Sequence, residues 1–196
     1  MMPVNQLRTQ GVNVAVFDPI SFADLFSVIK RLGIVTGEPV SAQQLVVGLE
    51  DRLNNVKKKL EQSKSTARPK VVFEVRYPNL LCAGTKTIVN DVIEYAGGTN
   101  CITNEKKIVR VDMERLISCN PDYYIVQRGP MNRNPQPTTD RPHFEVLEAV
   151  RKGRVMTVDE QLFSRPGPRS VDAVEQLARF IHPGLWQESQ PPEALP

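Results

Sequence analysis

The feature that most constrains this chain is a long amphipathic segment from Ser41 to Lys64. Its apolar side chains recur every three or four residues, a spacing that aligns them along one stripe of an α-helix: Ala42, Leu45, Val46, Leu49, Leu53, Val56 and Leu60. Ser41 followed by Gln44 is typical of a helix start, and lysines near the other end suit the helix dipole. At about 1.5 Å per residue, such a helix is a rod of roughly 35 Å. The sequence before it is too short for a domain, whereas the sequence after Pro69 is long enough for one.

Composition indicates an ordinary globular protein, sized for one domain or for a domain with an appendage. Its 196 residues are 40% hydrophobic and 24% charged, and the formal net charge is +3. The cations are scattered rather than gathered in one basic block, so nucleic acid is not an expected partner. No apolar run approaches the ~20 residues that cross a bilayer, and Met1 to Gln10 lacks the pattern of an export signal.

The cysteines favour free thiols over a metal site. Cys82, Cys101 and Cys119 are an odd number at wide and irregular spacing. This spacing argues against a zinc site and against a disulfide framework, and it favours buried free thiols. If the protein is exported, Cys101 and Cys119 are the pair to test for a bridge.

The segment before the long helix predicts a helix, a strand and a second helix. Asn5 to Gln10 reads as the end of a helix closed by Gly11, and Val12 to Phe17 alternates like a buried strand. A lone strand cannot bury both of its faces, so this one needs partner strands from sequence that is absent here. Ser21 then caps a short helix that Gly33 is expected to end.

After Pro69, predicted strands and helices alternate. The strands cover Val71–Val75, Ile108–Val111, Tyr123–Val126 and Val155–Val158, and the helices begin near Thr85 or Thr87, Asp112, Pro142 and Ser170. This order predicts an α/β fold with a Rossmann-like, mainly parallel sheet and helices on both faces, preceded by the long connecting helix. Gln187 to Pro196 reads as a disordered tail.

Ligands of such sheets bind at the carboxyl ends of the strands, where three predicted loops meet. These loops span Arg76–Lys86, Gln127–Arg141 and Asp159–Arg169. In the last loop, Arg165 stands before a helix start and could hold an anionic group, with Phe163 as an apolar wall. Pairing with a nearby carboxylate is an equal reading for Arg169. The other side chains expected on this rim are Tyr77, Asn79, Lys86 and Arg128.

No pattern in the sequence demands catalysis. The turn between Tyr77 and Thr85 contains only Gly84, and it matches neither a dinucleotide fingerprint nor a P-loop. His143 and His182 stand at helix ends and read as structural residues. Neither a nucleophile beside a base nor a carboxylate pair has a recognisable context. We therefore predict no catalytic residue, no metal ligand and no cofactor.

Several short stretches, taken together, carry a resemblance to a known family. They are Pro69 to Val75, Ala83-Gly84-Thr85 with Ala96 to Asn100, Glu114 with Asn120-Pro121-Asp122, and Pro166 to Arg169. In this order and spacing they resemble the periplasmic binding proteins of ABC importers for cobalamin, haem and ferric siderophores. The resemblance extends from about Gln6 to Pro183. In that family two α/β lobes are joined by one long helix and clasp the ligand between them. The segment Ser41 to Lys64 resembles that helix.

The resemblance implies a division of the chain. Residues 1–40 would be a remnant of the first lobe, 41–68 the connecting helix, 69–184 the carboxyl-terminal lobe and 185–196 a disordered tail. Side chains near Val56 and Leu60 would pack on the complete lobe. Apolar surface near the helix start would be exposed in this chain and would be covered by the missing lobe or by a second chain. The parent protein would be extracytoplasmic, periplasmic or lipid-anchored at the cell surface. Its partners would be an ABC permease and a small-molecule metal chelate.

The resemblance also implies functional residues. The segment Gln161 to Arg165 matches the part of the family's cobalamin binders that contacts cobalamin, and it includes Gln161, Leu162, Phe163 and Arg165. Leu162 stands where an aromatic residue is often found, which weakens cobalamin and leaves a ferric siderophore or haem open. Asp91 and Glu94 are candidates for the acidic residue with which each lobe docks on the permease.

Two readings from other classes stay open. A flavodoxin-like α/β enzyme or signalling domain would show a phosphate loop or an acidic cluster at the strand ends, and neither is visible. An interaction module would pair with a separately encoded first lobe, or would dimerise through its exposed strand.

Overall fold

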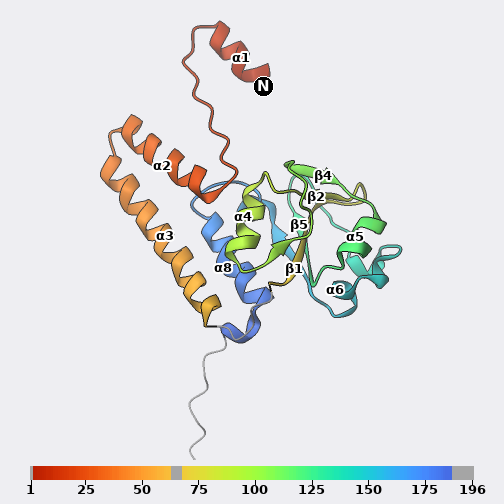
Figure 1. The fold of residues 1–196 in the computed structure, drawn as a ribbon. Coiled ribbons are helices and arrows are strands. Elements are labelled where there is room, and N and C mark those ends of the chain that lie inside the picture. Colours follow the sequence, from red (N-terminus) through yellow and green to blue (C-terminus); the bar gives the residue numbers. More distant parts are fainter. Residues whose placement is uncertain (1, 63–67, 187–196) are drawn as a thin grey trace, which may run out of the picture.

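The computed structural model describes residues 2–62 and 68–186, and it centres on one six-stranded sheet (Figure 1). The strand order is β4-β2-β1-β5-β6, and β3 pairs with the amino-terminal end of β1. The strands are β1 (Lys70–Arg76), β2 (Leu81–Ala83), β3 (Thr99–Asn100), β4 (Ile108–Arg110), β5 (Tyr123–Arg128) and β6 (Val155–Asp159).

The sheet is mainly parallel, as the sequence predicts. In the β1–β5 ladder, Val71 to Glu74 face Tyr123 to Val126, and β6 continues this parallel arrangement beside β5. The exception is β2, which turns back antiparallel beside the end of β1 and carries β4 as its own antiparallel partner. Because β2 is only 3 residues long, the sequence reads it as loop and gives no sign that β4 is an outlying strand.

Helices cover both faces of the sheet. One face of the sheet is covered by α4 (Ile88–Tyr95), α7 (Glu160–Phe163) and α8 (Ser170–Ile181). From outside, α3 (Pro39–Glu61) packs on α4 and α8, and α2 (Phe22–Thr36) packs beside α3 (Figure 1). The other face packs against α5 (Met113–Cys119), the 3₁₀ turn η2 (Phe144–Val146) and α6 (Glu148–Arg151). Val71 and Phe73 face the first layer and Val72 the second, because successive strand side chains point to opposite faces. The apolar run Val71 to Phe73 in β1 is therefore explained by a strand that is covered on both faces.

The predicted long helix exists as α3, but its start differs from the prediction. Pro39 occupies the first turn after Glu38, and Ser41 lies inside the helix, where its hydroxyl donates to Glu38 Oε2 at 2.8 Å. Ser41 as the helix cap is therefore wrong. Proline suits a first helical position because its φ is already helical and its missing N–H has no partner to lose there. The predicted end at Lys64 lies outside the described residues.

The far half of α3 packs on the sheet domain, as expected. Val56 is buried in the core shared with α8, and Leu60 packs against the same core. Arg52 adds a polar link to α8, with its guanidinium 2.6 Å from Asp172 and 2.9 Å from Glu175.

The glycine expected to end α2 lies inside it instead. The helix continues from Gly33 to Thr36, and Gly37 ends it with φ 79°. Gly33 is buried where α2 meets α3, and a Cβ there would collide with Ala42 and lie 2.9 Å from the Glu38 carbonyl oxygen. Helix contact, which is a tertiary effect, explains this glycine.

Val12 to Phe17 does not form the predicted strand. Residues 12–20 are extended and have no ladder partner among residues 2–62 and 68–186, and with α1 (Met2–Thr9) they project from the rest of the chain (Figure 1). Val12 and Val16 are 47% and 60% exposed. Alternation alone cannot make a strand, because the backbone groups of a strand need hydrogen-bonding neighbours.

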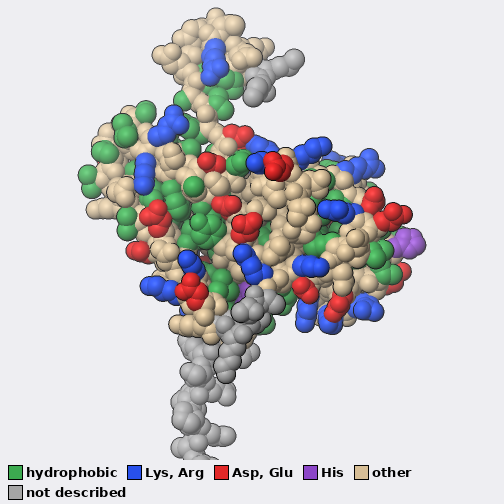
Figure 2. Space-filling view, in the orientation of Figure 1, with side chains coloured by type: hydrophobic (Ala, Val, Ile, Leu, Met, Phe, Trp, Pro, Cys, Tyr) green, Lys and Arg blue, Asp and Glu red, His purple; other side chains and the backbone are tan. Residues whose placement is uncertain are grey.

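The turn between α2 and α3 exposes apolar side chains. Ile34, Val35 and Val40 are 70%, 82% and 68% exposed, and Leu45 on the first turns of α3 is 44% exposed. Figure 2 shows hydrophobic side chains gathered over this helical hairpin. This is the apolar surface near the start of the long helix that the sequence predicts.

Two smaller expectations change, and a third is not tested. The helix predicted from Pro142 is divided into η2 and α6, because His143 adopts a left-handed φ of 67° and Leu147 is extended. The short helix α7 occupies the start of the predicted loop after β6. The predicted tail at 187–196 lies outside the described residues, which end in the 3₁₀ turn η3 (Pro183–Leu185) and Trp186.

The remaining 3₁₀ turn, η1, covers Thr138–Asp140. Over the described ranges, the helices include none with the length and apolarity to span a membrane.

Candidate functional site

The carboxyl ends of β1, β5 and β6 bring three loops to one edge of the sheet. These strands are parallel neighbours, so the residues that follow each of them emerge on the same side. We call this the carboxyl edge and define it as Arg76–Leu80, Arg128–Arg133 and Asp159–Arg165. Most of the predicted rim residues belong to it: Tyr77, Asn79, Arg128, Gln161, Leu162, Phe163 and Arg165.

The polar members of this set face solvent. Asn79, Arg128, Gln161 and Arg165 are exposed. Arg128 ends β5 opposite Asp159 of β6, and the Asp159 carboxylate accepts hydrogen bonds from the backbone of Gln161 and Leu162 at the start of α7. An Asp at this position caps the start of α7, where Gln161 is exposed. Exposed polar side chains from three neighbouring loops thus meet at this edge.

The apolar members contribute to packing rather than to the rim. Phe163 is fully buried and stacks on Phe73 of β1 with 6.1 Å between ring centroids, so it is not the solvent-facing wall expected for a ligand. Leu162 is half-buried against the same core. Tyr77 is half-buried, and the guanidinium of Arg141 lies 4.2 Å from its ring centroid. The sequence could not distinguish these roles because a buried and an exposed aromatic look alike in a loop.

Lys86 lies away from the other predicted rim residues. Lys86 follows β2, which runs antiparallel to β1. It therefore lies toward the amino-terminal end of β1, whereas Tyr77 follows the carboxyl-terminal end of β1. Its ammonium is 3.7 Å from Glu105, and its backbone N–H donates to the Lys106 carbonyl at 3.3 Å. The structure therefore places Lys86 beside the loop that enters β4.

The two predicted docking carboxylates have different surroundings. Asp91 Oδ2 accepts a hydrogen bond from the backbone N–H of Phe22 at 2.8 Å, which ties α4 to the start of α2. Burial raises the pKa of the Asp91 carboxyl, and the neighbouring charge of Glu94 acts in the same direction. Glu94 is exposed and accepts a hydrogen bond from Asn90 Nδ2 at 2.9 Å. Of the pair, Glu94 is the side chain open to a partner.

A buried ion pair, which the sequence did not reveal, lies behind the carboxyl edge. Glu74 of β1 and Arg141 have fully buried side chains, joined by bonds of 2.5 and 3.1 Å. Tyr124 of β5 donates its hydroxyl hydrogen to Glu74 Oε2 at 2.7 Å, and Arg141 also donates to the Gln136 carbonyl. Burial, reinforced by the Glu74 charge, raises the pKa of Tyr124 well above its usual range. The long loop after β5 is thus anchored into the core.

The same loop is held at its start by a second set of contacts. The buried carboxylate of Glu160 accepts the backbone N–H of Met131 at 2.8 Å, and Asn132 Nδ2 donates to the Gln127 carbonyl at 2.9 Å. The Ser164 hydroxyl donates to Gln127 Oε1. These contacts connect the loops after β5 and β6, so the loop expected to be exposed has two buried attachments. The one signal in the sequence was Glu74, a charged residue among the apolar residues of β1, and it concerns the first attachment.

The histidines stand where expected, at the ends of elements. His143 is exposed, and His182 is half-buried at the end of α8. Burial lowers the pKa of His182, so the structure disfavours the helix-end cation that the sequence suggested.

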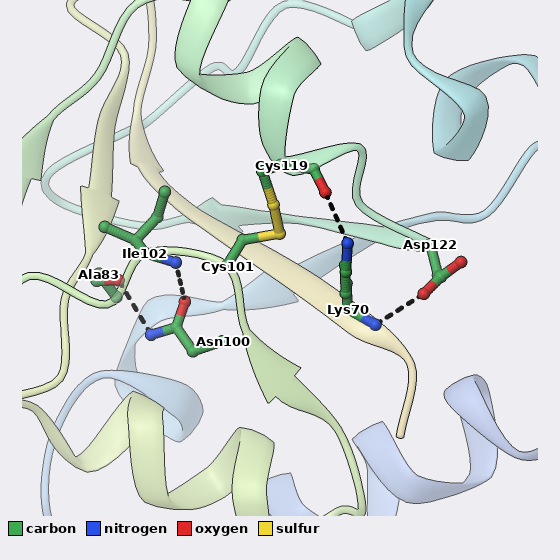
Figure 3. Close-up of a disulfide and its surroundings, with 7 residues drawn as sticks. All are labelled: Lys70, Ala83, Asn100, Cys101, Ile102, Cys119 and Asp122. Carbon is green, nitrogen blue, oxygen red and sulfur yellow. Dashed lines mark hydrogen bonds between the residues drawn. A yellow bond between two sulfur atoms is a disulfide. The ribbon is translucent and has the colours of Figure 1, made fainter. Parts of the chain in front are cut away.

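Two cysteines form a disulfide, which corrects the expectation of free thiols. The bridge joins Cys101, after β3, to Cys119 at the end of α5, with 5.9 Å between their Cα atoms (Figure 3). Beside it, Lys70 at the start of β1 donates from Nζ to the Cys119 carbonyl at 3.3 Å. Cys82 is a buried free thiol, and burial raises its pKa well above the usual range. The bridge is the pair singled out for an exported protein.

Comparison with known proteins identifies the family. Residues 4–162 match the family described as periplasmic binding protein. The chain belongs to this family. Membership of this family argues against the alternative of a flavodoxin-like enzyme or signalling domain, and it agrees with the resemblance seen in the sequence.

Relatives and solved structures agree with this assignment. The chain is 27% identical over 187 residues to the uncharacterized ABC transporter substrate-binding lipoprotein YvrC of Bacillus subtilis, covering 94% of this chain and 59% of the relative. It is 25% identical over 183 residues to the vitamin B12-binding protein of Photorhabdus laumondii, covering 92% and 62%. The chain thus spans about three fifths of the length of these relatives. A possible iron-binding periplasmic protein of Staphylococcus epidermidis superposes with a TM-score of 0.75 at 26% identity, covering 91% of this chain and 70% of that one.

Proposed function

We propose that this chain is the ligand-binding lobe and connecting helix of the substrate-binding component of an ABC importer. It binds a metal chelate, which is a ferric siderophore, haem or cobalamin, and delivers it to a permease without catalysing a reaction. The supporting observation is the convergence of Asn79, Arg128, Gln161 and Arg165 on the carboxyl edge of a sheet in this family. Relatives named for vitamin B12 and for iron support the chelate class.

We further propose that the division of the chain follows the two-lobe scheme. In this scheme, α3 is the connecting helix, residues 69–184 are the second lobe and residues 1–40 belong with the first lobe. The exposed apolar turn between α2 and α3 supports a covering partner, either the first lobe or a second chain. Glu94, with Asp91 behind it, is the proposed contact with the permease.

An extracytoplasmic location for the parent protein is part of the same proposal. The Cys101–Cys119 disulfide supports it, because such bridges persist in oxidising compartments. A relative that is a lipoprotein supports it as well.

Isothermal titration calorimetry with haem, cyanocobalamin and a ferric siderophore tests the binding function. We expect micromolar or tighter binding of one ligand, weakened about tenfold or more when Arg165→Ala removes a charged donor. Absorbance of the chelate is a better optical signal than tryptophan fluorescence, because Trp186 lies far from the carboxyl edge. The helix α8, which is 12 residues long, begins near that edge, and Trp186 follows its other end.

Arg151→Ala is the matched control, since Arg151 is an exposed arginine on α6, before β6 rather than after it. This variant should bind like the unchanged protein. Titrations are performed on the chain as given by its sequence. If the folded chain binds none of the three ligands, the proposed ligand class is wrong.

A further inference from the structure

Two arginines end neighbouring strands at corresponding positions. The parallel β1–β5 ladder pairs Glu74 with Val126, and Arg76 and Arg128 each stand two residues beyond that pair. Neighbouring strands lie about 4.8 Å apart, so both arginines leave the sheet at its carboxyl edge. Both side chains are exposed. Like charges on adjacent strands are unfavourable unless another charge compensates them.

No ion pair compensates these two charges within the part of the chain that the structure describes. Arg76 and Arg128 take part in none of its ion pairs, and neither do Arg133 and Arg165, the two other exposed arginines of the carboxyl edge. Four guanidinium groups therefore face solvent around one edge of the sheet.

The carboxylates near these arginines are engaged elsewhere. Glu74 is buried against Arg141 and Tyr124, and Glu160 is buried against the backbone of Met131. Asp159 is the exposed neighbour of Arg128 in the ladder, but its carboxylate caps α7. The edge therefore keeps an excess of positive charge after its own acids are counted.

A buried amide next to Arg128 has an unpaired donor. Gln127 precedes Arg128 and is fully buried, and its Nε2 has no hydrogen-bond partner among the described residues. Its Oε1 accepts the hydroxyl hydrogen of Ser164, the residue before Arg165. A buried donor without an acceptor is costly in a folded protein. The unpaired donor lies between the two loops that carry Arg128 and Arg165.

We infer that the carboxyl edge selects metal chelates that carry several negative charges over neutral chelates. The inference rests on the proposed binding function and adds the charge of the ligand, which that function leaves open. Guanidinium groups recognise carboxylate and catecholate oxygens through charge-assisted, often bidentate hydrogen bonds. A chelate whose carboxylate or catecholate oxygens carry net negative charge can pair with the four exposed arginines of the carboxyl edge. A neutral hydroxamate complex has no net charge with which these arginines could pair.

Calorimetric titration with probes of different charge tests the inference. The anionic probes are ferric citrate and ferric enterobactin, and the neutral probes are ferrichrome and cyanocobalamin. We expect one anionic probe to bind at least about tenfold more tightly than either neutral probe, with an affinity that falls as sodium chloride is raised. Arg76→Gln and Arg128→Gln should each weaken that probe about 10- to 100-fold.

Two further variants distinguish charge from general damage. Arg128→Lys keeps the charge without the planar fork, so its affinity should lie between those of the unchanged protein and Arg128→Gln. Arg151→Gln removes an exposed arginine on α6 and should leave every titration unchanged. Tighter binding of a neutral probe would overturn the charge preference while leaving the binding function intact. Failure of these four probes and of haem to bind would overturn both.

Discussion

At the scale of single residues, the most consequential interaction is the ion pair between Glu74 and Arg141. Both side chains are fully buried, and Glu74 also accepts a hydrogen bond from Tyr124. The desolvation of two charges offsets much of their attraction, so the intact pair need not add net stability. Loss of one partner is different, because it leaves a charge in the core without compensation.

Replacing Arg141 with Ala should therefore lower the free energy of unfolding by about 3–5 kcal/mol. The measurement is urea denaturation followed by circular dichroism. The double variant Glu74→Leu, Arg141→Met should recover most of the loss, since neither charge remains. Arg151→Ala, at an exposed site, should change stability by less than about 0.5 kcal/mol. A single Arg141→Ala effect as small as that of Arg151→Ala would contradict the importance of the pair.

At the scale of elements, the contact between α2 and α3 depends on one missing side chain. Gly33 lies against Ala42 and the Glu38 carbonyl, where an added Cβ has no space. In α3, Gly48 is also within a helix, but nothing lies within 4 Å of its added Cβ. The same substitution therefore has opposite consequences in two neighbouring helices.

Gly33→Ala should destabilise the protein by about 1–3 kcal/mol, because the clash exceeds the gain in helix propensity. Gly48→Ala should stabilise it by about 0.5–1 kcal/mol, since only the propensity changes. Thermal and urea unfolding of the two variants and the unchanged protein provide the comparison. Equal stabilisation by both alanines would show that α2 and α3 do not approach as closely as described.

At the scale of the whole molecule, the disulfide is the covalent link between distant parts of the sequence. Cys101 and Cys119 are separated by 18 positions, and the bridge holds α5 to the segment after β3 on one face of the sheet. It restricts the unfolded chain more than the folded one. Cys82 is buried apart from this link.

The double variant Cys101→Ser, Cys119→Ser should lose about 3 kcal/mol of unfolding free energy, as expected for a closed loop of this length. Urea titration with and without reductant measures the loss, and reductant should have no effect on the variant. In the oxidised protein, a thiol reagent should modify one cysteine, Cys82, and only after unfolding. Rapid labelling of two or three cysteines in the folded protein would show that the bridge is absent.

The sequence by itself determined the α/β alternation, the three longest parallel strands β1, β5 and β6, and most helix starts. Ser21, Thr87 and Asp112 cap their helices as expected, because capping depends on side chains within one turn. The edge that collects Asn79, Arg128, Gln161 and Arg165 was also predictable, since parallel strands bring their carboxyl ends together.

Only the tertiary structure decided which residues of these segments are buried and what they contact. Gly33 serves a helix contact rather than a helix end, Phe163 lies in the core rather than on the rim, and Arg141 reaches Glu74 across 67 positions. Val12 to Phe17 alternates like a strand yet has no ladder partner in the described chain. The physical reason is the same in each case. Periodicity and capping depend on neighbours along the chain, whereas close packing, buried charge and strand pairing depend on neighbours brought together by folding.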